Sequence, residues 1–247
     1  MTPIIVIPSR MASSRLPGKP LADIHGQPMI VHVLHRALEA DIGPVGVACA
    51  EPAIADAIRA AGGRAVLTDP ALPTGSDRVY AALAELDPGG GCDVVVNLQG
   101  DVPTVSPDQI RASIRPLEDP GIDIGTVVAP IVSVEEANTP SFVKAACAFA
   151  EGQEVAGALY FSRLPVPWGD GPLWHHVGIY AFRRGALARF VSLPESPLER
   201  REKLEQLRAM EAGMRIGCAR VGHGLFGVDT LADLERARRL LAQKTSA

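Results

Sequence analysis

The sequence predicts an α/β fold with a doubly wound, mainly parallel twisted sheet and a smaller mixed β extension. Short apolar runs alternate with helical patterns through the first half of the chain. These runs are apolar on both faces, as strands of a parallel sheet are. The alternation loosens after the run Ile124–Val132. With 247 residues, 47% of them hydrophobic, the chain can bury a core large enough for this fold.

The first half of the chain has the clearest pattern. Pro28 suits a helix start, and Met29, Val33 and Leu34 then recur at helical spacing. Single helices between consecutive strands imply parallel pairing with right-handed crossovers. The expected strands are Ile4–Ile7, Val45–Ala50, Arg64–Thr68 and Val94–Asp101, and the expected helices are Pro28–Ala40, Pro52–Gly63 and Ser76–Leu86.

The second half predicts strands joined by non-helical connections, including the Pro- and Gly-rich loop Leu164–Trp174. We expect this extension, at about 140–200, to cover the site or a partner subunit. Since the chain shows no repeat or linker, residues 1–247 are expected to form a single domain. The expected strands are Ile124–Val132, Phe142–Ala150, Ala158–Ser162, His176–Phe182 and Arg215–Val221, and the expected helices are Ser196–Gly213 and one from Thr230 to about Ala242.

Composition excludes several functional classes. The net charge is −4 and the pI is about 5.9, so the general basic field of a nucleic-acid-binding or membrane-docking protein is absent. No segment approaches the about 20 apolar residues of a membrane span, and the first residues carry no basic leader, so a cytoplasmic protein is expected. The cysteines form no CxxC pair, which favours buried thiols in a reducing compartment: Cys49, Cys92, Cys147 and Cys218.

The loop after the first strand, "PSRMASSRLPGKPL", holds Arg10, Arg15 and Lys19. It matches neither the Walker phosphate loop nor the Rossmann glycine motif, which disfavours P-loop NTPases and classical NAD enzymes. Side-chain cations at this spacing, with the hydroxyls of Ser13 and Ser14 between them, suit a triphosphate. The alternative is that these are solvated loop charges.

Two aspartates provide the acidic counterpart. Asp101 follows the buried strand of "VVVNLQGD", and Asp229 precedes the last helix. Phosphate chemistry commonly uses Mg²⁺ held by one or two carboxylates, so both are candidate metal ligands. Alternatively, Asp101 is a turn carboxylate, and Asp229 belongs to a helix start where Thr230 and Asp233 form a capping box. No DxD motif of the GT-A glycosyltransferases is present.

A set of collinear blocks spanning nearly the whole chain resembles the 3-deoxy-manno-octulosonate (Kdo) cytidylyltransferases, or CMP-Kdo synthetases. Any single block is a weak signal, but the full series in one order is specific. The blocks are "IPSRMASSRLPGKPL", "TGSDRV", "NLQGD", "LYFSR", "PVPW", "HVGIY", "LEQLR" and "GVDT".

The resemblance implies a Rossmann-like, GT-A-like nucleotidyltransferase fold and a Mg²⁺-dependent transfer of CMP from CTP to the anomeric hydroxyl of Kdo. Arg10, Arg15 and Lys19 would hold the triphosphate, and Asp101 and Asp229 the metal. The remaining residues that it implies in nucleotide binding are Pro8, Ser9, Ser13, Gly75, Ser76 and Arg78. The product would serve lipopolysaccharide synthesis, and members of the family are typically homodimers.

The same resemblance implies a pocket for the sugar acid, whose carboxylate needs a cation and whose hydroxyls need neutral partners. For some of these residues the alternative is a role outside sugar binding. His176 would then be a surface or satisfied core histidine, Tyr180 a residue of the sheet core, and Glu205 and Gln206 part of a solvated helix face. The implied sugar-binding residues are Gln99, Arg163, His176, Tyr180, Glu205 and Gln206.

One departure from the family pattern is Val102, which stands where the family commonly has Glu in "QGDEP". Loss of a carboxylate beside a metal ligand could alter the metal's surroundings and leaves room for a variant sugar acid. Two alternatives therefore remain. One is a CMP-sialic acid synthetase, although "SSRLPGKPL" fits the Kdo enzymes better; the other is a non-catalytic nucleotide-sensing protein.

Overall fold

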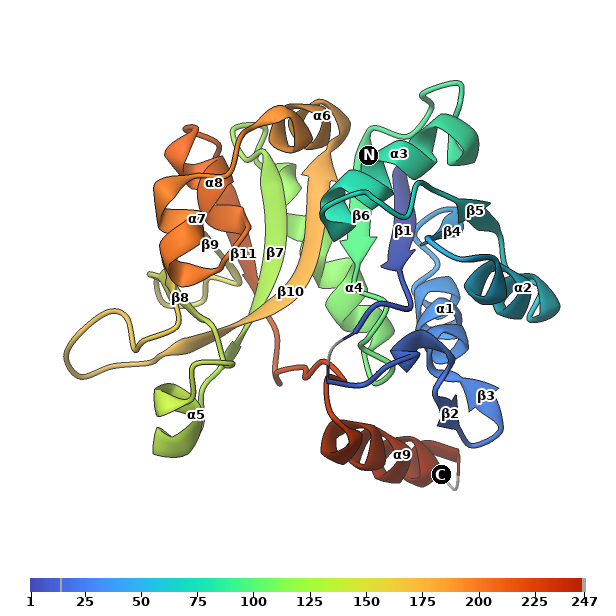
Figure 1. Cartoon of the computed structure of the whole chain (residues 1–247). Helices are drawn as coiled ribbons and strands as arrows, with labels where there is room; N and C mark the ends of the chain where they lie inside the picture. The colour runs from blue at the N-terminus through green and yellow to red at the C-terminus, as the bar shows by residue number, and fades with distance from the viewer. Residues whose placement is uncertain (14, 246–247) are drawn as a thin grey trace. The chain divides into compact units, whose positions relative to one another are not determined.

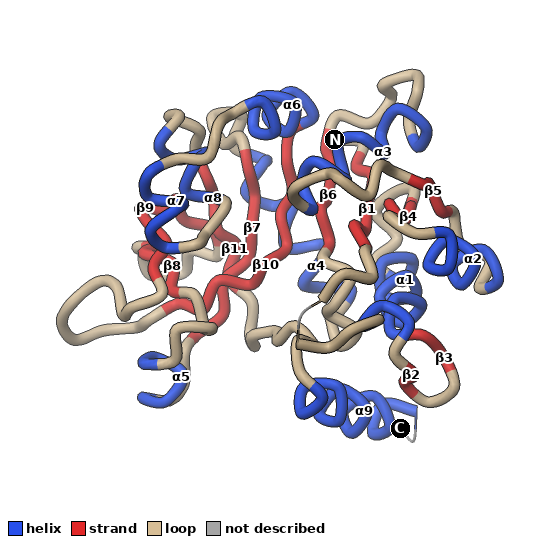
Figure 2. Tube along the Cα trace, viewed as in Figure 1, coloured by secondary structure: helices blue, strands red, loops and turns tan. Residues whose placement is uncertain are grey.

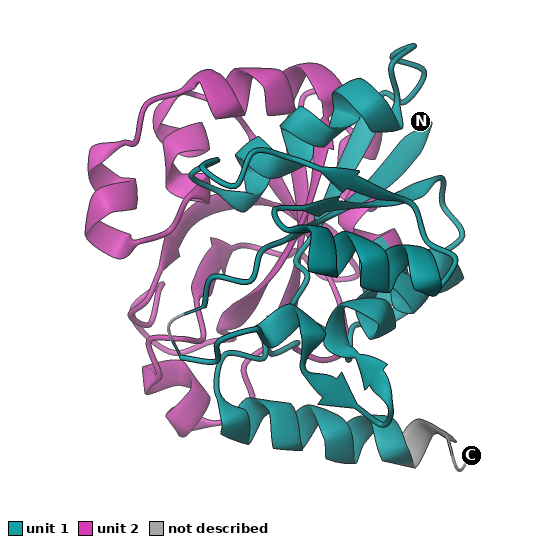
Figure 3. Cartoon of the chain, turned by 45° about the vertical axis from the view of Figure 1, so that its right-hand side comes forward, with its two compact units in different colours: residues 1–110, 225–247 teal, residues 111–224 magenta. Residues whose placement is uncertain are grey.

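The computed structural model describes residues 1–13 and 15–245, so Ser14 lies outside the described residues. The chain divides into two compact units, residues 1–110 with 225–247 and residues 111–224 (Figure 3). The chain is α/β, and its strand pairings include parallel and antiparallel ones.

Unit 1 is built on a parallel sheet of four strands in the order β5-β4-β1-β6 (Figure 1). The central strand β1 (Pro3–Ser9) pairs with its neighbours on either side, with Ile5 opposite Val45 and Val6 opposite Asn97. The expected parallel pairing in the first half is therefore confirmed. The other strands of this sheet are β4 (Val45–Cys49), β5 (Ala65–Leu67) and β6 (Val94–Leu98).

Helices cover both faces of this sheet. Helix α3 packs directly on one face, where Leu86 lies against Gly46 of β4. The contact is so close that a Cβ atom at position 46 would come 2.5 Å from the Leu86 side chain. On the other face, Ile30 of α1 and Ile7 of β1 both lie close to Gly100. The helices of unit 1 that follow its strands are α1 (Met29–Glu39), α2 (Pro52–Ala60) and α3 (Gly75–Leu86).

The last helix, α9 (Leu231–Thr245), packs beside the small antiparallel hairpin of β2 (Asp23–Ile24) and β3 (Gln27–Pro28) (Figure 1). Leu234, Ala237 and Leu241 of the helix form a buried cluster with Ile24 and Met29. This packing fixes the start of α9, where Asp229 lies, close to the loop that ends in the short 3-10 helix η1 (Lys19–Leu21).

Unit 2 contains a mixed sheet whose pairings form a closed cycle. The strands follow the order β10-β7-β11-β9-β8, and β8 also pairs with the start of β10. β7 and β11 are parallel, whereas β10 runs antiparallel to β7. The strands are β7 (Ile124–Pro130), β8 (Lys144–Cys147), β9 (Val155–Ser162), β10 (Trp174–Arg183) and β11 (Ile216–Arg220).

Several helical segments after β6 were not expected from the sequence (Figure 2). Helix α6 begins directly at the end of β10 without a loop, so no turn residues marked it. The segments without a predicted counterpart are α4 (Pro107–Ile114), which spans the boundary between the units, η2 (Arg115–Glu118), α5 (Val134–Asn138) and α6 (Arg184–Ser192).

The single helix expected over Ser196–Gly213 is wrong. The structure divides it into α7 (Pro197–Glu202) and α8 (Gln206–Glu211), with Lys203 in the left-handed conformation at φ 57°. At the break, the guanidinium of the distant Arg163 donates to the carbonyls of Glu202 and Lys203. The apolar periodicity of the segment 196–213 could not reveal this break, since it carries no information about contacts with a distant residue.

Candidate active site

The loop between β1 and η1 carries the three cations expected to bind a triphosphate. Near its start, the backbone N–H of Met11 donates to Glu51 Oε2 at 2.9 Å. At its end, Gly18 adopts a left-handed φ of 70°, and the N–H of Leu21 donates to the Gly18 carbonyl at 2.9 Å. Glycine adopts this conformation without strain. The turn that it makes leads directly into Lys19.

Lys19 joins the two aspartates. Its Nζ donates to Asp101 Oδ2 at 2.7 Å and to Asp229 Oδ1 at 3.0 Å, with 13% of the side chain exposed. Burial works against the lysine's charge, but the two carboxylates outweigh this effect and raise its pKa. Two carboxylates from distant parts of the chain therefore converge on one cation.

The carboxylate of Asp229 is not used to cap α9. The backbone N–H groups of Asp229 and Thr230 donate to Asp233 Oδ2, and Asp233 N–H donates back to Thr230 Oγ1 at 3.2 Å. Thr230 and Asp233 thus form the capping box by themselves. This leaves Asp229 to Lys19 and to Arg15, whose Nη2 lies 2.9 Å from Asp229 Oδ2.

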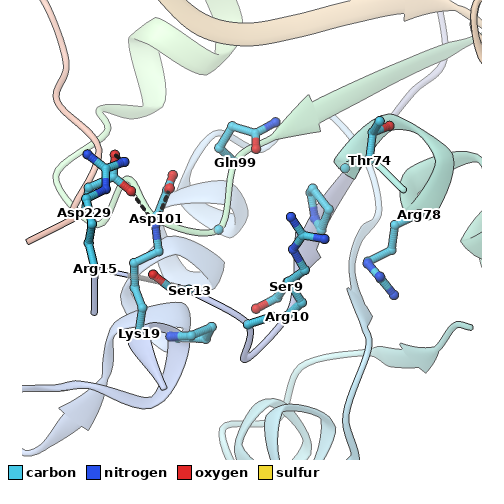
Figure 4. A pocket seen from close by; sticks show the side chains of 15 residues that line it. Ser9, Arg10, Ser13, Arg15, Lys19, Thr74, Arg78, Gln99, Asp101 and Asp229 are labelled. Carbon is cyan, nitrogen blue, oxygen red and sulfur yellow. Dashed lines mark hydrogen bonds and ion pairs between the residues drawn. The ribbon is translucent and has the colours of Figure 1, made fainter. Parts of the chain in front are cut away.

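These groups line a cavity of about 370 Å³ within unit 1 (Figure 4). The expected residues that line it are Pro8, Ser9, Arg10, Ser13, Arg15, Lys19, Gly75, Arg78, Gln99, Asp101 and Asp229. It is also lined by Ala12, Pro20, Thr74 and Gly100, which the sequence reasoning did not assign.

Two polar groups of the cavity wall are available to a ligand. The guanidinium of the exposed Arg10 makes no hydrogen bond or ion pair with any of the described residues. Ser9 is 6% exposed, and its Oγ has no hydrogen-bond partner within the part of the chain that the structure describes. Since a buried hydroxyl without a partner costs free energy, a polar ligand at this wall would be favoured.

Arg78 enters the cavity wall from the first turn of α3. Thr74 caps this helix in a reciprocal capping box with Asp77. Arg78 is only 2% exposed, and its guanidinium donates to Thr68 Oγ1 at 2.6 Å and to the Asp69 carbonyl at 3.1 Å. Burial, with Arg10 as a secondary cause, lowers the pKa of Arg78. Its acceptors are neutral, so the positive charge remains available to the cavity.

Asn97 is a residue that the sequence reasoning missed. It is 1% exposed in the otherwise apolar strand β6. Its Oδ1 accepts from Gln99 Nε2 at 3.1 Å, and its Nδ2 donates to Ser76 Oγ at 3.4 Å. Ser76 is thus turned toward Asn97 and does not line the cavity, whereas Gln99 does. A buried amide in an apolar strand was the available signal for Asn97.

In unit 2, His176 and Tyr180 lie together, with ring centroids 5.3 Å apart. Thr126 Oγ1 is 3.0 Å from His176 Nε2 and donates to the Ile179 carbonyl at 2.7 Å. Because the single hydroxyl proton is used on Ile179, we assign the proton of the imidazole to Nε2. Burial, and secondarily His175, lowers the pKa of His176 to about 3, so the ring is neutral. Its Nδ1 is then an acceptor.

The neighbouring candidates have similar surroundings. Burial, followed by the nearby Glu205 carboxylate, raises the pKa of Tyr180, which therefore remains a hydroxyl donor. Gln206 is 5% exposed, and its Nε2 has no hydrogen-bond partner among residues 1–13 and 15–245. His176, Tyr180 and Glu205 thus form one polar cluster, although their roles in sugar binding stay predictions.

Arg163 follows the end of β9, and its guanidinium is held by backbone carbonyls. Nε donates to Glu202 at 2.7 Å, Nη1 to Pro140 at 3.1 Å and Nη2 to Lys203 at 3.0 Å. The carboxylate of Glu202 accepts from the backbone N–H of Arg163. The role of Glu202 was not anticipated, because only the fold brings α7 to the end of β9.

Among the described residues, no group of three or more His, Cys, Asp and Glu side chains is placed to hold a metal ion. Within the same residues, no helix is both long and apolar enough to cross a membrane.

Known proteins resemble the chain over nearly its whole length. The family model described as cytidylyltransferase matches residues 4–216. The 3-deoxy-manno-octulosonate cytidylyltransferase of Rhodospirillum centenum is 63% identical over 99% of this chain and 95% of its own. The enzyme of the same name from Paramagnetospirillum magneticum is 58% identical over 98% of both chains.

Solved structures agree with this relationship. The structure of CMP:2-keto-3-deoxy-manno-octonic acid synthetase complexed with CTP aligns with a TM-score of 0.90 and 40% identity, covering 99% of this chain and 100% of that one. Sequence and structure therefore lead to one assignment: the chain belongs to the cytidylyltransferase family, within the group of 3-deoxy-manno-octulosonate cytidylyltransferases.

Proposed function

We propose that this protein transfers CMP from CTP to the anomeric hydroxyl of Kdo, forming CMP-Kdo and pyrophosphate. The observation that carries this proposal is the cavity of unit 1, where the cations of one loop and two distant carboxylates meet in a chain that is 63% identical to a Kdo cytidylyltransferase. In the reaction, the anomeric oxygen bonds to the α-phosphorus of CTP and the bond from that phosphorus to the bridging oxygen breaks. The hydroxyl proton passes to water.

The loop cations are proposed to hold the triphosphate. Arg10 and Arg15 offer exposed guanidinium groups, which pair strongly with phosphate oxygens, and Lys19 adds an ammonium whose charge the carboxylates stabilise. Arg78 contributes a buried charge with neutral acceptors. Such groups stabilise charge that develops on phosphate oxygens during transfer. Pro8, Ser9 and Gly75 would enclose the base and ribose.

Asp101 and Asp229 are the residues proposed to hold Mg²⁺. Their fit rests on one observation: Asp101 Oδ2 and Asp229 Oδ1 already bind a common cation, the ammonium group of Lys19. Carboxylate oxygens are preferred ligands of Mg²⁺, with phosphate oxygens and water completing the coordination. A bound Mg²⁺ would neutralise part of the triphosphate charge. In the structure, Lys19 and Arg15 together pair with the two carboxylates.

In unit 2, the sugar acid is proposed to bind through Arg163, His176, Tyr180, Glu205 and Gln206. Gln99, which lines the cavity of unit 1, stays a separate predicted sugar-binding residue. Arg163 would pair with the sugar's carboxylate, because its charge is solvated only by neutral carbonyls. Neutral His176 would accept at Nδ1 from a sugar hydroxyl, and Tyr180 would donate from its own. A mixed set of donors and acceptors suits a polyhydroxylated substrate.

We further propose that two copies of the chain form a homodimer. The protein is proposed to act in the cytoplasm of a cell that makes lipopolysaccharide. Its proposed fold is the doubly wound fold of nucleotidyltransferases. The support for a dimer comes from unit 2, which exposes large apolar side chains. Leu159 is 72% exposed, Leu164 69% and Trp168 100%. Apolar groups exposed to this extent commonly mark contact surfaces, and a second copy of the chain is the proposed partner.

A substrate panel tests the function. Pyrophosphate release is measured with CTP and Mg²⁺ against Kdo and N-acetylneuraminate, and with UTP in place of CTP. The proposal expects turnover with CTP and Kdo. Turnover with N-acetylneuraminate alone would refute the choice of sugar, and calorimetric CTP binding without pyrophosphate release would favour a non-catalytic sensor.

A further inference from the structure

Within the described part of the chain, the guanidinium of Arg163 in unit 2 is held by backbone carbonyls alone. It donates to the carbonyls of Pro140, Glu202 and Lys203, at distances between 2.7 and 3.1 Å. These bonds use three of the five N–H groups of an arginine. One N–H remains on each of Nη1 and Nη2, and these two N–H groups can bind a carboxylate in a bidentate manner.

The peptide groups of Arg163 are held as well, by side chains of opposite charge. The carboxylate of Glu202 accepts from the Arg163 backbone N–H at 2.9 Å, and the ammonium of Lys144 donates to its carbonyl at 3.0 Å. Lys144 is 0% exposed and also donates to the Thr139 carbonyl at 2.9 Å. Burying an ammonium group with only neutral acceptors costs free energy. Lys144 nevertheless holds the carbonyl of Arg163 in this way.

Glu202 connects the end of β9 with the break between α7 and α8. Its Oε1 accepts from Ser162 Oγ at 3.1 Å, while its own carbonyl and that of Lys203 accept from the Arg163 guanidinium. Those carbonyls would otherwise accept from residues four positions on in a continuous helix. The break between α7 and α8, with Lys203 at φ 57°, therefore provides acceptors for Arg163. A left-handed non-glycine residue costs free energy that these bonds offset.

The charge of Arg163 nevertheless lacks an ion-pair partner among the described residues, because the Glu202 carboxylate faces the end of β9. We propose that Glu202 is a positioning residue, which holds the end of β9 and the α7–α8 break together so that the two remaining N–H groups of Arg163 face the carboxylate of the sugar acid. This inference rests on the proposed function, since it takes the sugar acid as the ligand of Arg163.

Steady-state kinetics with Kdo and CTP test the proposal. Glu202→Ala should raise the KM for Kdo about tenfold. The substitution removes the carboxylate that accepts from the backbone N–H of Arg163, so the arginine side chain is no longer held in position. Glu202→Gln retains one acceptor oxygen and should have a smaller effect. For both variants the KM for CTP should stay within about twofold of the wild type. The control, Glu195→Gln, removes an exposed carboxylate of the same unit and should change neither constant.

A double-mutant cycle identifies the residue through which Glu202 acts. In an Arg163→Ala background, Glu202→Gln should cause no further rise in the KM for Kdo. Additive effects, or equal increases in both KM values, would overturn the proposal, since they indicate a general structural role.

A crystal structure of Glu202→Ala gives a readout that does not depend on turnover. We expect the Arg163 guanidinium to leave at least one of its three carbonyls, and an unchanged guanidinium would overturn the inference. Failure of the proposed function is distinguishable from this outcome. It would appear as wild-type protein that releases no pyrophosphate with Kdo, whatever the position of Arg163 in the variant.

Discussion

Lys19 Nζ lies 2.7 Å from Asp101 Oδ2, in a contact that joins the loop after β1 to the turn after β6 across 82 positions of sequence. The same ammonium group binds Asp229 from the start of α9. Three segments that are remote in sequence thus meet at one charged centre. The parallel order of β1 and β6 brings the carboxyl ends of both strands to the same edge of the sheet, which is where ligands bind in such sheets.

Asp101→Asn should lower kcat about 100-fold or more while weakening CTP binding much less. The amide keeps the shape of the side chain but removes the charge expected to act through the metal. Calorimetry with CTP and a pyrophosphate-release assay over a range of Mg²⁺ concentrations separate the two effects. A variant that turned over at the wild-type rate at every Mg²⁺ concentration would show that Asp101 is not a metal ligand.

Arg15→Ala should weaken CTP binding about tenfold and hardly change stability. The side chain is 64% exposed, so its ion pair with Asp229 is screened by solvent and adds little to the free energy of unfolding. The matched control is Arg59→Ala, which removes an exposed arginine of α2 that pairs with Asp56. Equal losses of CTP affinity in the two variants would point to net charge as the cause.

Asn97→Leu should raise the KM for Kdo severalfold, because the amide of Gln99 would lose the acceptor that orients it. The free energy of unfolding should change by only about 1 kcal/mol, since an apolar side chain of similar size replaces a buried amide. Kinetics together with urea unfolding measure both quantities. A large loss of stability with an unchanged KM would mean that Asn97 supports only the packing of β6.

Stability should fall with acid in the range in which unfolded histidine titrates. The pKa of buried His176 is about 3, below the ordinary value of 6.5, so between these values only the unfolded state binds the proton. The stabilising contribution of the neutral ring is complete above pH 6.5 and is lost as the pH falls toward 3. His175, with a pKa of about 4, acts in the same direction.

His176→Gln should therefore reduce the slope of the free energy of unfolding against pH by up to about 1.4 kcal/mol per pH unit, the equivalent of one proton. Urea unfolding at several pH values between 4 and 7 measures this slope. Replacement of the exposed His223 by Gln controls for the loss of an imidazole. An unchanged slope in His176→Gln would contradict the assignment of a neutral, buried ring.

The sequence was most informative where one element follows another at regular spacing. The strand expected at Ile4–Ile7 is β1, the helix expected from Pro28 is α1, and the last helix begins next to Thr230 as expected. Local apolar periodicity and capping residues are sufficient to determine such elements.

What could not be predicted depends on contacts between distant residues. At the break, Arg163 donates to the carbonyl of Lys203. Asn97 has hydrogen bonds with Ser76 and Gln99. Neither leaves a periodic signal. The same limit applies to Lys19, whose position in the loop suggested phosphate binding but not its two carboxylate partners.

The most direct measurement of the central claim is an anomalous difference map from crystals grown with CTP and Mn²⁺. The account predicts a metal peak bound by the carboxylates of both Asp101 and Asp229, with the triphosphate contacting Arg10, Arg15 and Lys19. A nucleotide bound elsewhere, or a metal held by neither aspartate, would contradict it.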